Sequence, residues 1–191
     1  MTVHSHSNST TPSRPSRRRL LRAATLATLP LIGASRVIAA SPAPRNLVFE
    51  HTHTGEALSL DWHPGAWMPA ALERIRWFLR DFRSGETHAI DPLLIDQLAT
   101  LAAVTATSAP FQVISGYRSV STNEALRRRG GSASGVASHS LHIEGRAIDI
   151  RLADVRLDDL RDAAISLKAG GVGFYPDAQF VHIDTGRMRR W

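Results

Sequence analysis

Two segments in the last third of the chain place histidines and acids among apolar residues. In the segment 180–184, His182 and Asp184 alternate with apolar residues, so both project from one face if the segment is a β-strand. Asp149 lies between two isoleucines, where a carboxylate costs free energy unless it is paired, hydrogen-bonded or bound to a metal. His142, seven residues earlier, can fold back toward the same point. The pattern therefore predicts a cluster of His142, Asp149 and His182.

The residue types in this cluster suit a catalytic zinc ion. The chain has no cysteine, so a metal would have to bind imidazole and carboxylate groups. Two imidazoles and one carboxylate leave a fourth tetrahedral position for water, which is the pattern of catalytic zinc sites. Each residue also has an ordinary structural interpretation. His142 would then be a surface loop histidine, Asp149 a buried carboxylate paired with Arg146 or Arg118, and His182 a hydrogen-bonded strand histidine.

Several other polar residues have weaker claims on the site. Ser115 and Ser140 lack the glycine-flanked turn that presents a nucleophilic serine, so we expect both to hydrogen-bond loops. His139 is near the cluster in sequence and is either a site residue or a solvated loop histidine. His51 and His53 alternate on a predicted strand with no accompanying carboxylate pattern, and we predict that both are surface residues.

The elements that must position the cluster can be predicted from periodicity, caps and turns. Asn46–Asp61 is expected to form a β-hairpin that turns near Gly55, and Asp91 with Pro92 suits the start of a helix. The expected helices span Pro69–Phe82, Pro92–Val104, Ser121–Arg128 and Leu157–Ala169, and the later strands Phe111–Ser115, Arg146–Leu152, Val172–Phe174 and Phe180–Asp184. Helices early and strands late favour an α+β fold, a small antiparallel sheet with flanking helices.

The N-terminal segment 1–40 is expected to be an export signal. It contains a run of arginines followed by Leu20-Leu21, an apolar alanine-rich stretch over 23–34 and small residues at its end. The stretch is too short for a membrane span, which needs about 20 apolar residues. The paired arginines resemble a twin-arginine signal, with an uncleaved basic anchor as the alternative. We therefore predict a periplasmic protein with a linker over 41–45 and one domain over 46–191.

The formal net charge of +6 does not indicate a nucleic-acid partner. Residues 1–40 contain six of the 23 lysines and arginines and no acid, so 17 basic residues remain beside 17 acidic ones. A nearly neutral domain lacks the basic face expected of a nucleic-acid-binding protein.

The spacing around the cluster resembles the signature of the peptidase M15 class, the zinc D-alanyl-D-alanine peptidases. In this sequence, the residues that match the signature are, in order, Ser140, His142, Gly145, Ala147 and Asp149. The resemblance to the MepK-type subfamily of periplasmic murein endopeptidases is closer. It includes the segments Ile90–Pro92, Ile114–Ser119, Gly170–Gly173 and Phe180–Gly186 and the final residue, Trp191.

The resemblance implies a fold like that of hedgehog and D-Ala-D-Ala peptidase domains, and a Zn²⁺ enzyme that cuts peptide cross-links of peptidoglycan (murein). It places His142, Asp149 and His182 on the three ligand positions. Many relatives carry an acidic base three residues before the last ligand, where this chain has Gln179. The base is therefore predicted to be Asp184, with Asp177 as the second candidate.

A mechanism follows from zinc chemistry. The metal lowers the pKa of bound water toward about 7 and polarises the scissile carbonyl, while a carboxylate carries the proton to the leaving amine. Arg118 is predicted to bind the oxyanion or a substrate carboxylate, since its guanidinium pairs with planar anions. Two other functions stay open. One is a D-alanyl-D-alanine carboxypeptidase or dipeptidase, and the other is a non-catalytic, zinc-stabilised module that binds peptidoglycan.

Overall fold

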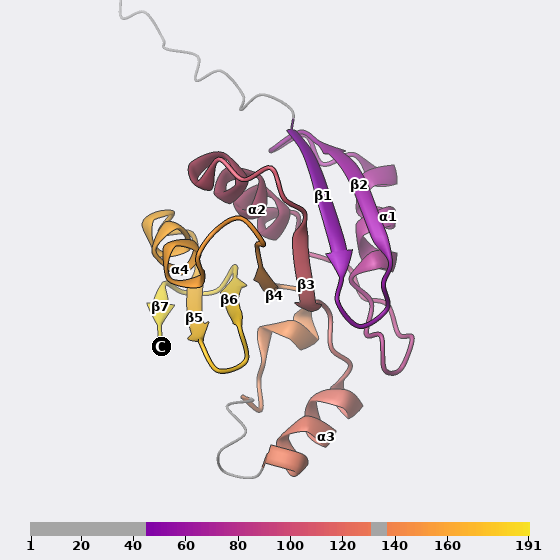
Figure 1. Ribbon diagram of the computed structural model, residues 1–191. Coiled ribbons are helices and arrows are strands. Elements are labelled where there is room, and N and C mark those ends of the chain that lie inside the picture. The colour runs from indigo at the N-terminus through magenta and orange to yellow at the C-terminus, as the bar shows by residue number, and fades with distance from the viewer. Residues whose placement is uncertain (1–44, 131–136) are drawn as a thin grey trace, which may run out of the picture. The chain divides into compact units, whose positions relative to one another are not determined.

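A computed structural model describes residues 45–130 and 137–191 (Figure 1). The predicted signal over 1–40, nearly all of the linker over 41–45 and most of the Gly- and Ser-rich loop after residue 130 lie outside the described residues. Within the described part, no helix has both the length and the apolar character that crossing a bilayer requires.

Seven strands form one mixed sheet in the order β2-β1-β3-β4-β6-β5-β7. Their bounds are β1 Arg45–His51, β2 Ala57–Trp62, β3 Phe111–Ser115, β4 Ala147–Arg151, β5 Gly171–Tyr175, β6 Phe180–Asp184 and β7 Arg189–Arg190. The α+β class is confirmed, but the prediction of a purely antiparallel sheet is wrong, because β1 pairs parallel with β3 and β5 with β7. Two helices lie between β2 and β3 in the chain, and such a crossover allows the chain to enter β3 in the direction of β1.

The helices are α1 Pro69–Phe78, α2 Pro92–Thr105, α3 Val120–Gly130 and α4 Leu157–Ser166, with a short 3-10 helix, η2, over Leu141–Glu144. The Asp91 carboxylate accepts a hydrogen bond from the backbone N–H of Leu93, which confirms the predicted cap of α2. The α3 helix begins at Val120, one residue before the predicted Ser121. The Ser119 hydroxyl accepts a hydrogen bond from the backbone N–H of Thr122.

The central strand β4 separates the hydrophobic core from the polar cluster. Ile148 and Ile150 on one face are fully buried and join a core that includes Leu94, Leu98 and Leu101 of α2. Asp149 projects from the opposite face, because side chains alternate along a strand. The sheet therefore has apolar packing on one side of β4 and the chemistry-bearing residues on the other.

His51 corrects another prediction. Its side chain is only 2 % exposed, so it is not a surface residue, and its ring packs edge-on against Phe78 and Phe82. Burial is the main cause that lowers the pKa of His51. The aromatic partners come from α1 and the segment after it, which sequence alternation within β1 could not reveal.

Asp81 fastens the segment between β3 and α3. Its carboxylate accepts hydrogen bonds from the backbone N–H and the hydroxyl of Ser119, at 2.9 and 2.7 Å. Burial acts to raise the pKa of Asp81, but hydrogen bonds from Thr122, Ser119 and Arg83 outweigh it and lower the pKa to about 2. The ionised carboxylate thus holds the residue that directly follows Arg118.

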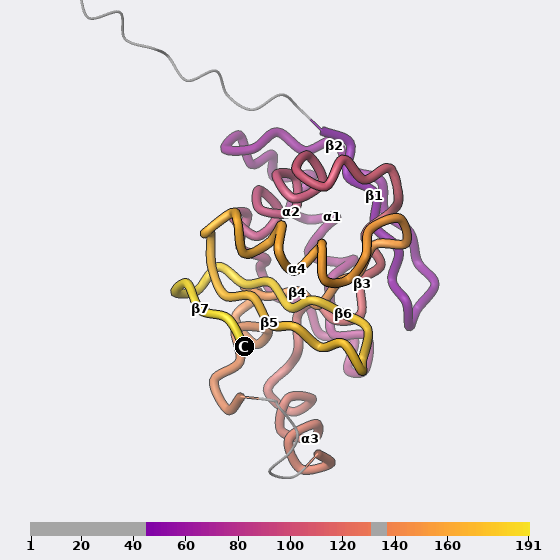
Figure 2. Tube along the Cα trace, turned by 60° about the vertical axis from the view of Figure 1, so that its left-hand side comes forward, coloured from indigo at the N-terminus to yellow at the C-terminus, as the bar shows by residue number. Residues whose placement is uncertain are grey.

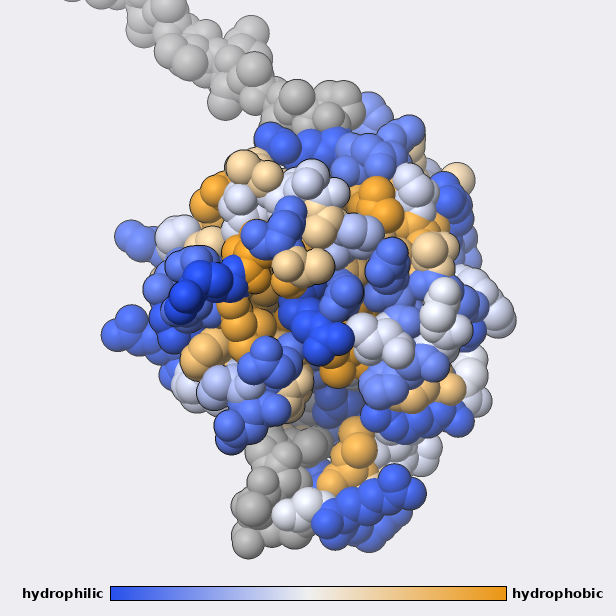
Figure 3. Space-filling view, viewed as in Figure 1, coloured by the Kyte–Doolittle hydropathy of each residue, from blue (hydrophilic) through white to orange (hydrophobic). Residues whose placement is uncertain are grey.

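In two views of the chain, α3 lies beyond one end of the sheet, apart from α2 and α4 (Figure 2). The α2 and α4 helices contact each other, and α4 packs on β5 and β6. On the face seen in Figure 3, hydrophobic side chains are scattered among hydrophilic ones. The α4 helix therefore covers one face of β5 and β6, and the opposite face, which carries the cluster, is available for a site.

Candidate metal centre

The predicted cluster forms on one row of residues across the sheet. Ser115 on β3 pairs with Asp149 on β4, Asp149 pairs with His182 on β6, and His182 pairs with Gly173 on β5. Residues directly opposite one another in neighbouring antiparallel strands share a face. Strand register alone therefore brings Asp149 and His182 together.

His142 reaches the row from η2, an element that the sequence did not predict. The Ser140 hydroxyl caps this turn by accepting a hydrogen bond from the backbone N–H of His142. Gly145 ends the turn with a φ of 66°, in the left-handed region that favours glycine. The reversal leads the chain into β4, so His142 does fold back toward Asp149 as predicted.

The three candidate ligand atoms form a small triangle. His142 Nε2 lies 3.2 Å from Asp149 Oδ1 and 3.2 Å from His182 Nδ1, and His182 Nδ1 lies 2.8 Å from Asp149 Oδ1. All three residues are buried. In tetrahedral zinc sites with bonds of about 2.0–2.1 Å, neighbouring ligand atoms are roughly 3.3 Å apart, so the triangle matches the spacing around such an ion.

Contacts on the outer side of each imidazole fix which nitrogen faces the triangle. His142 Nδ1 donates to the backbone carbonyl of Gly116 at 2.7 Å, and His182 Nε2 donates to Asp184 Oδ2 at 3.1 Å. Each ring therefore turns its other nitrogen inward, as metal-binding histidines do. A proton on His182 Nδ1 would make a hydrogen bond to Asp149 alone, whereas a metal cation inside the triangle would contact all three inward atoms.

The electrostatics of the cluster favour unprotonated His142 and ionised Asp149. Burial lowers the pKa of His142. For Asp149, burial acts in the opposite direction, but the contacts with His142 and His182 outweigh it and keep the pKa well below its usual range. Burial also acts to lower the pKa of His182, and its hydrogen bonds with Asp149 and Asp184 raise it overall.

The Asp184 side chain, the first candidate for the base, lies behind His182 and does not line the cavity beside the cluster. Its side chain is 0 % exposed, and its oxygens accept hydrogen bonds from the backbone N–H groups of Gly171 and Gly186 and from both terminal nitrogens of Arg189. Burial raises its pKa, but the contacts with His182, Gly186, Gly171 and Arg189 lower it overall. With these partners, the carboxylate contacts the outer nitrogen of His182 and is turned away from the ligand triangle.

The second candidate for the base, Asp177, lies away from the triangle, and so does Gln179, which stands where many relatives carry an acidic base. Asp177 and Gln179 are exposed in the turn between β5 and β6, and the Gln179 amide donates to the carbonyl of Pro176. Neither lines the cavity beside the cluster, where Asp149 is the only described aspartate or glutamate. His139 does line this cavity, although its ring is exposed and contacts the Ser138 hydroxyl.

Arg118 borders the triangle. It is 8 % exposed, and its terminal nitrogen lies 3.5 Å from Asp149 Oδ2. Its remaining contacts, to Asn123 and Ser115, are long at 3.4 Å, and its buried Nε has no partner among the described residues. Arg146, the alternative partner of Asp149, instead pairs with Glu144 and lies near Asp91. The guanidinium thus keeps hydrogen-bonding capacity beside the cluster.

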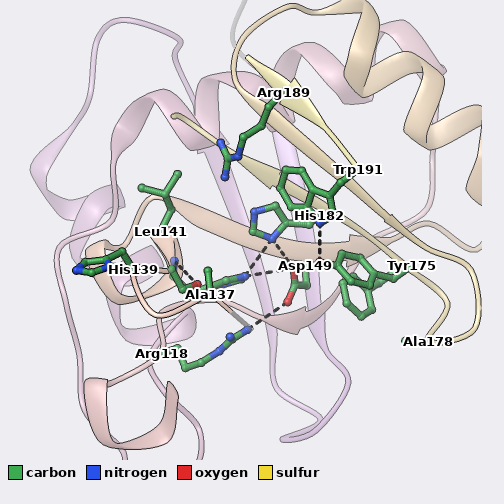
Figure 4. A pocket seen from close by; sticks show the side chains of 13 residues that line it. Arg118, Ala137, His139, Leu141, Asp149, Tyr175, Ala178, His182, Arg189 and Trp191 are labelled. Carbon is green, nitrogen blue, oxygen red and sulfur yellow. Dashed lines mark hydrogen bonds and ion pairs between the residues drawn. The ribbon is translucent and has the colours of Figure 1, made fainter. Parts of the chain in front are cut away.

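A cavity of about 280 Å³ opens beside the cluster (Figure 4). Its lining includes Arg118, His142, Asp149 and His182 and, from the end of the chain, Arg189 and Trp191. Roles for Arg189, Trp191 and Tyr175 were missed in the sequence. The only sequence signal near them was the family resemblance, which included Gly170–Gly173 and Trp191. Contacts between β5, β6 and the last residues depend on the fold, so no local pattern could reveal these roles.

Comparisons with known proteins identify the family of the chain. The profile of the Peptidase_M15_2 family, described as peptidoglycan L,D-endopeptidase MepK, matches residues 39–191. The chain is 43% identical over 152 residues to peptidoglycan L,D-endopeptidase MepK of Escherichia coli (strain K12), which covers 79% of this chain and 82% of that relative. It is 42% identical over 153 residues to the probable peptidoglycan L,D-endopeptidase MepK of Haemophilus influenzae, with 79% and 81% covered.

No solved structure gives a significant match to the chain. The family profile nevertheless extends over the whole described part, including every residue of the ligand triangle and of the cavity lining named above. The chain therefore belongs to the peptidase M15 family, in the group described as peptidoglycan L,D-endopeptidase MepK.

Proposed function

We propose that this peptidoglycan endopeptidase is a zinc enzyme that hydrolyses L,D bonds in peptide cross-links, with His142, Asp149 and His182 as the metal ligands. The observation that carries the proposal is the triangle of inward-facing ligand atoms, which lie within 4.8 Å of one another. Two imidazoles and one carboxylate, each supported from outside by a carbonyl, a carboxylate or an arginine, are a donor set suited to catalytic zinc.

Zinc bound there would supply an activated water and polarise the scissile carbonyl. The protein's own residues orient and support the centre. Gly116 fixes His142 through its carbonyl, and Asp184 fixes His182. Arg118 lies near the other carboxylate oxygen of Asp149, Oδ2, and lines the cavity (Figure 4).

Arg118 is proposed to bind an anionic group of the substrate. In an L,D bond, the scissile carbonyl is attached to a carbon of L configuration, and the scissile amine is attached to a carbon of D configuration, the D-centre. The D-centre also carries a carboxyl group, so an anion lies one carbon away from the scissile nitrogen. A buried guanidinium with unfilled hydrogen-bonding capacity is well suited to bind that carboxylate.

Asp184 is proposed to position His182 rather than to take a proton from water. Replacing Asp184 by asparagine is then expected to lower zinc affinity by about 10–100-fold, because the outer partner of a metal-binding histidine sets its orientation and basicity. Activity should return when zinc is added in excess. Zinc affinity is measured by competition with a chelator, and activity on purified cross-linked muropeptides.

The matched control is Asp177→Asn, which changes an exposed acid in the neighbouring turn. If Asp184 were the base, its asparagine variant would bind zinc normally and stay inactive at every zinc concentration. If Asp177 were the base, the control variant would show that behaviour instead.

Digestion of purified sacculi tests the reaction. With zinc-loaded protein, we expect dimers joined by L,D cross-links to decrease and monomers to increase, with no free D-alanine, as measured by chromatography and mass spectrometry of the muropeptides. Release of D-alanine from uncross-linked stems would instead identify a carboxypeptidase. Binding of zinc and sacculi without any product would identify a non-catalytic binding module.

We also propose that the chain acts in the periplasm after export by its twin-arginine-type segment. The support is the arginine pair and apolar run within residues 1–40, together with a substrate that lies outside the inner membrane. Fusing residues 1–45 to a reporter should direct it to the periplasm, and replacing both Arg17 and Arg18 by lysine should retain it in the cytoplasm. Export of the lysine variant at the normal rate would contradict the twin-arginine route.

A further inference from the structure

The end of the chain returns to the metal centre. β7 pairs parallel with β5, and Trp191 continues this pairing. Its backbone N–H donates to the carbonyl of Val172, and its carbonyl accepts from the N–H of Phe174. Two backbone hydrogen bonds therefore fix the position of Trp191 relative to the strand next to β6.

The Trp191 indole occupies space that exists only because residue 173 is glycine. A Cβ atom at Gly173 would lie 2.7 Å from the indole ring, which is closer than van der Waals contact. Gly173 lies directly opposite His182 in the sheet. The glycine does not have a positive φ, so its small size and not its backbone freedom is what the indole requires.

Tyr175 and Phe180 extend the indole into an aromatic wall. Trp191 Nε1 donates to the Tyr175 hydroxyl at 2.7 Å, and the Tyr175 and Phe180 rings stack at 4.5 Å between centroids. The indole lies 5.3 Å from the His182 ring. We call Trp191, Tyr175 and Phe180 the aromatic wall; all three line the cavity beside the ligand triangle.

The aromatic wall is fixed in place yet open to the cavity. Trp191 is 49 % exposed, so its indole does not serve mainly to fill the core. Figure 4 shows Trp191 and Tyr175 on one side of Asp149 and Arg118 on the other. An aromatic surface and a guanidinium thus face the same cavity across the cluster, which suits a ligand with a hydrocarbon chain and a carboxylate.

A residue that is linked into its own peptide stem by one amino group and into the cross-link by another is a diamino acid. We propose that Trp191 and Tyr175 form a specificity-determining subsite that binds the hydrocarbon chain of this diamino acid. The inference rests on the proposed function and adds to it the part of the substrate that the wall recognises. Aromatic faces pack well against aliphatic chains, and a wall prefixed by hydrogen bonds loses little conformational entropy on binding. Arg118 on the opposite side would hold the carboxylate of the same substrate.

The test compares variants that remove or displace the indole. Trp191→Ala is expected to raise KM for a cross-linked muropeptide about tenfold with little change in kcat, and Trp191→Phe to raise it less. Gly173→Ala should resemble Trp191→Ala, because it displaces an indole that is still present. Trp77→Ala is the matched control, since Trp77 is an exposed tryptophan on α1 that does not line this cavity.

A binding measurement gives a readout independent of catalysis. An uncross-linked disaccharide-tripeptide that ends in the diamino acid should change the tryptophan fluorescence of the wild type and of Trp77→Ala, but not of Trp191→Phe. Zinc content and thermal unfolding are measured for each variant. A purely structural role would appear as reduced zinc content or stability, with KM unchanged in the variants that remain folded.

The two proposals fail in different ways. If the wild type cleaves the cross-link and the Trp191 and Gly173 variants keep the wild-type KM and fluorescence response, the subsite is wrong and the enzyme assignment stands. If no protein cleaves the cross-link but the tripeptide still changes the Trp191 fluorescence, the reaction is wrong and the subsite stands.

Discussion

Replacement of Asp149 by asparagine is expected to abolish zinc binding and to reduce hydrolysis of cross-linked muropeptides by at least about 10³-fold. The carboxylate is the one anionic group among the three proposed ligands, and its Oδ1 lies 2.8 and 3.2 Å from the inward nitrogens of His182 and His142. An amide carries no charge, and without bound zinc the activated water and the polarised carbonyl are both lost. Metal content after dialysis and initial rates on a purified dimer check the expectation.

Thermal unfolding separates this loss from misfolding. Zinc that binds only the folded state stabilises it by about 4 kcal/mol when its concentration is 1,000 times Kd. The wild type should therefore unfold at a higher temperature with zinc than with a chelator, whereas Asp149→Asn and His182→Ala should give one temperature in both conditions. Asp177→Asn, with an exposed acid, should keep the wild-type response. A full equivalent of zinc in Asp149→Asn, with normal activity, would refute the proposed centre.

The sequence could predict those parts of the site that depend on alternation within a strand. His182 and Asp184 do share one face of β6, and Asp149 does project away from the core beside two buried isoleucines. The strand Phe180–Asp184 has the predicted bounds. A side-chain period of two residues makes such statements local, so they need no knowledge of which strands are neighbours.

Roles that depend on neighbouring strands could not be predicted in this way. Asp184 was predicted to be a base because it lies two residues from a ligand. In the structure, its partners include the backbone N–H of Gly171 on β5 and the guanidinium of Arg189 on β7. The sequence could not reveal these partners, because it does not show that β5 lies between β6 and β7 in the sheet. The parallel pairing of β1 with β3 was missed for the same reason, since strand direction depends on the crossover through α1 and α2.

The glycine-rich segment 170–173 shows how the fold gives a motif its meaning. In the sequence, these glycines contributed to the family resemblance without indicating what each one does. In the structure, a Cβ at Gly171 would lie 2.5 Å from the Asp184 carboxylate and from Arg189, and one at Gly173 would meet the indole of Trp191. The glycines therefore make room for the residues that support His182 and for the aromatic wall, two functions that no local pattern displays.

Replacement of Arg118 by alanine is expected to reduce kcat/KM by about 10²–10³-fold, the effect of removing a donor aimed at developing or fixed negative charge. The guanidinium is buried beside Asp149, and its Nε has no partner among the described residues. Arg118→Lys should recover only part of the loss, because an ammonium cannot bind a planar anion with two parallel hydrogen bonds. Arg127→Ala, which alters an exposed arginine in the last turn of α3, is the control and should retain wild-type kinetics.

A substrate change distinguishes the two anions that Arg118 could bind. If it binds the carboxylate of the D-centre, amidation of that carboxylate should raise KM for the wild type and have little effect on Arg118→Ala, because the interacting pair is already broken. If it stabilises the oxyanion, both enzymes should respond equally to amidation, and Arg118→Ala should lose kcat on either substrate. Wild-type kinetics for Arg118→Ala on both substrates would exclude both roles.

Arg118 and the aromatic wall face one cavity from opposite sides. If Arg118 and Trp191 bind the same substrate residue, amidation of its carboxylate should also reduce the effect of Trp191 variants on KM.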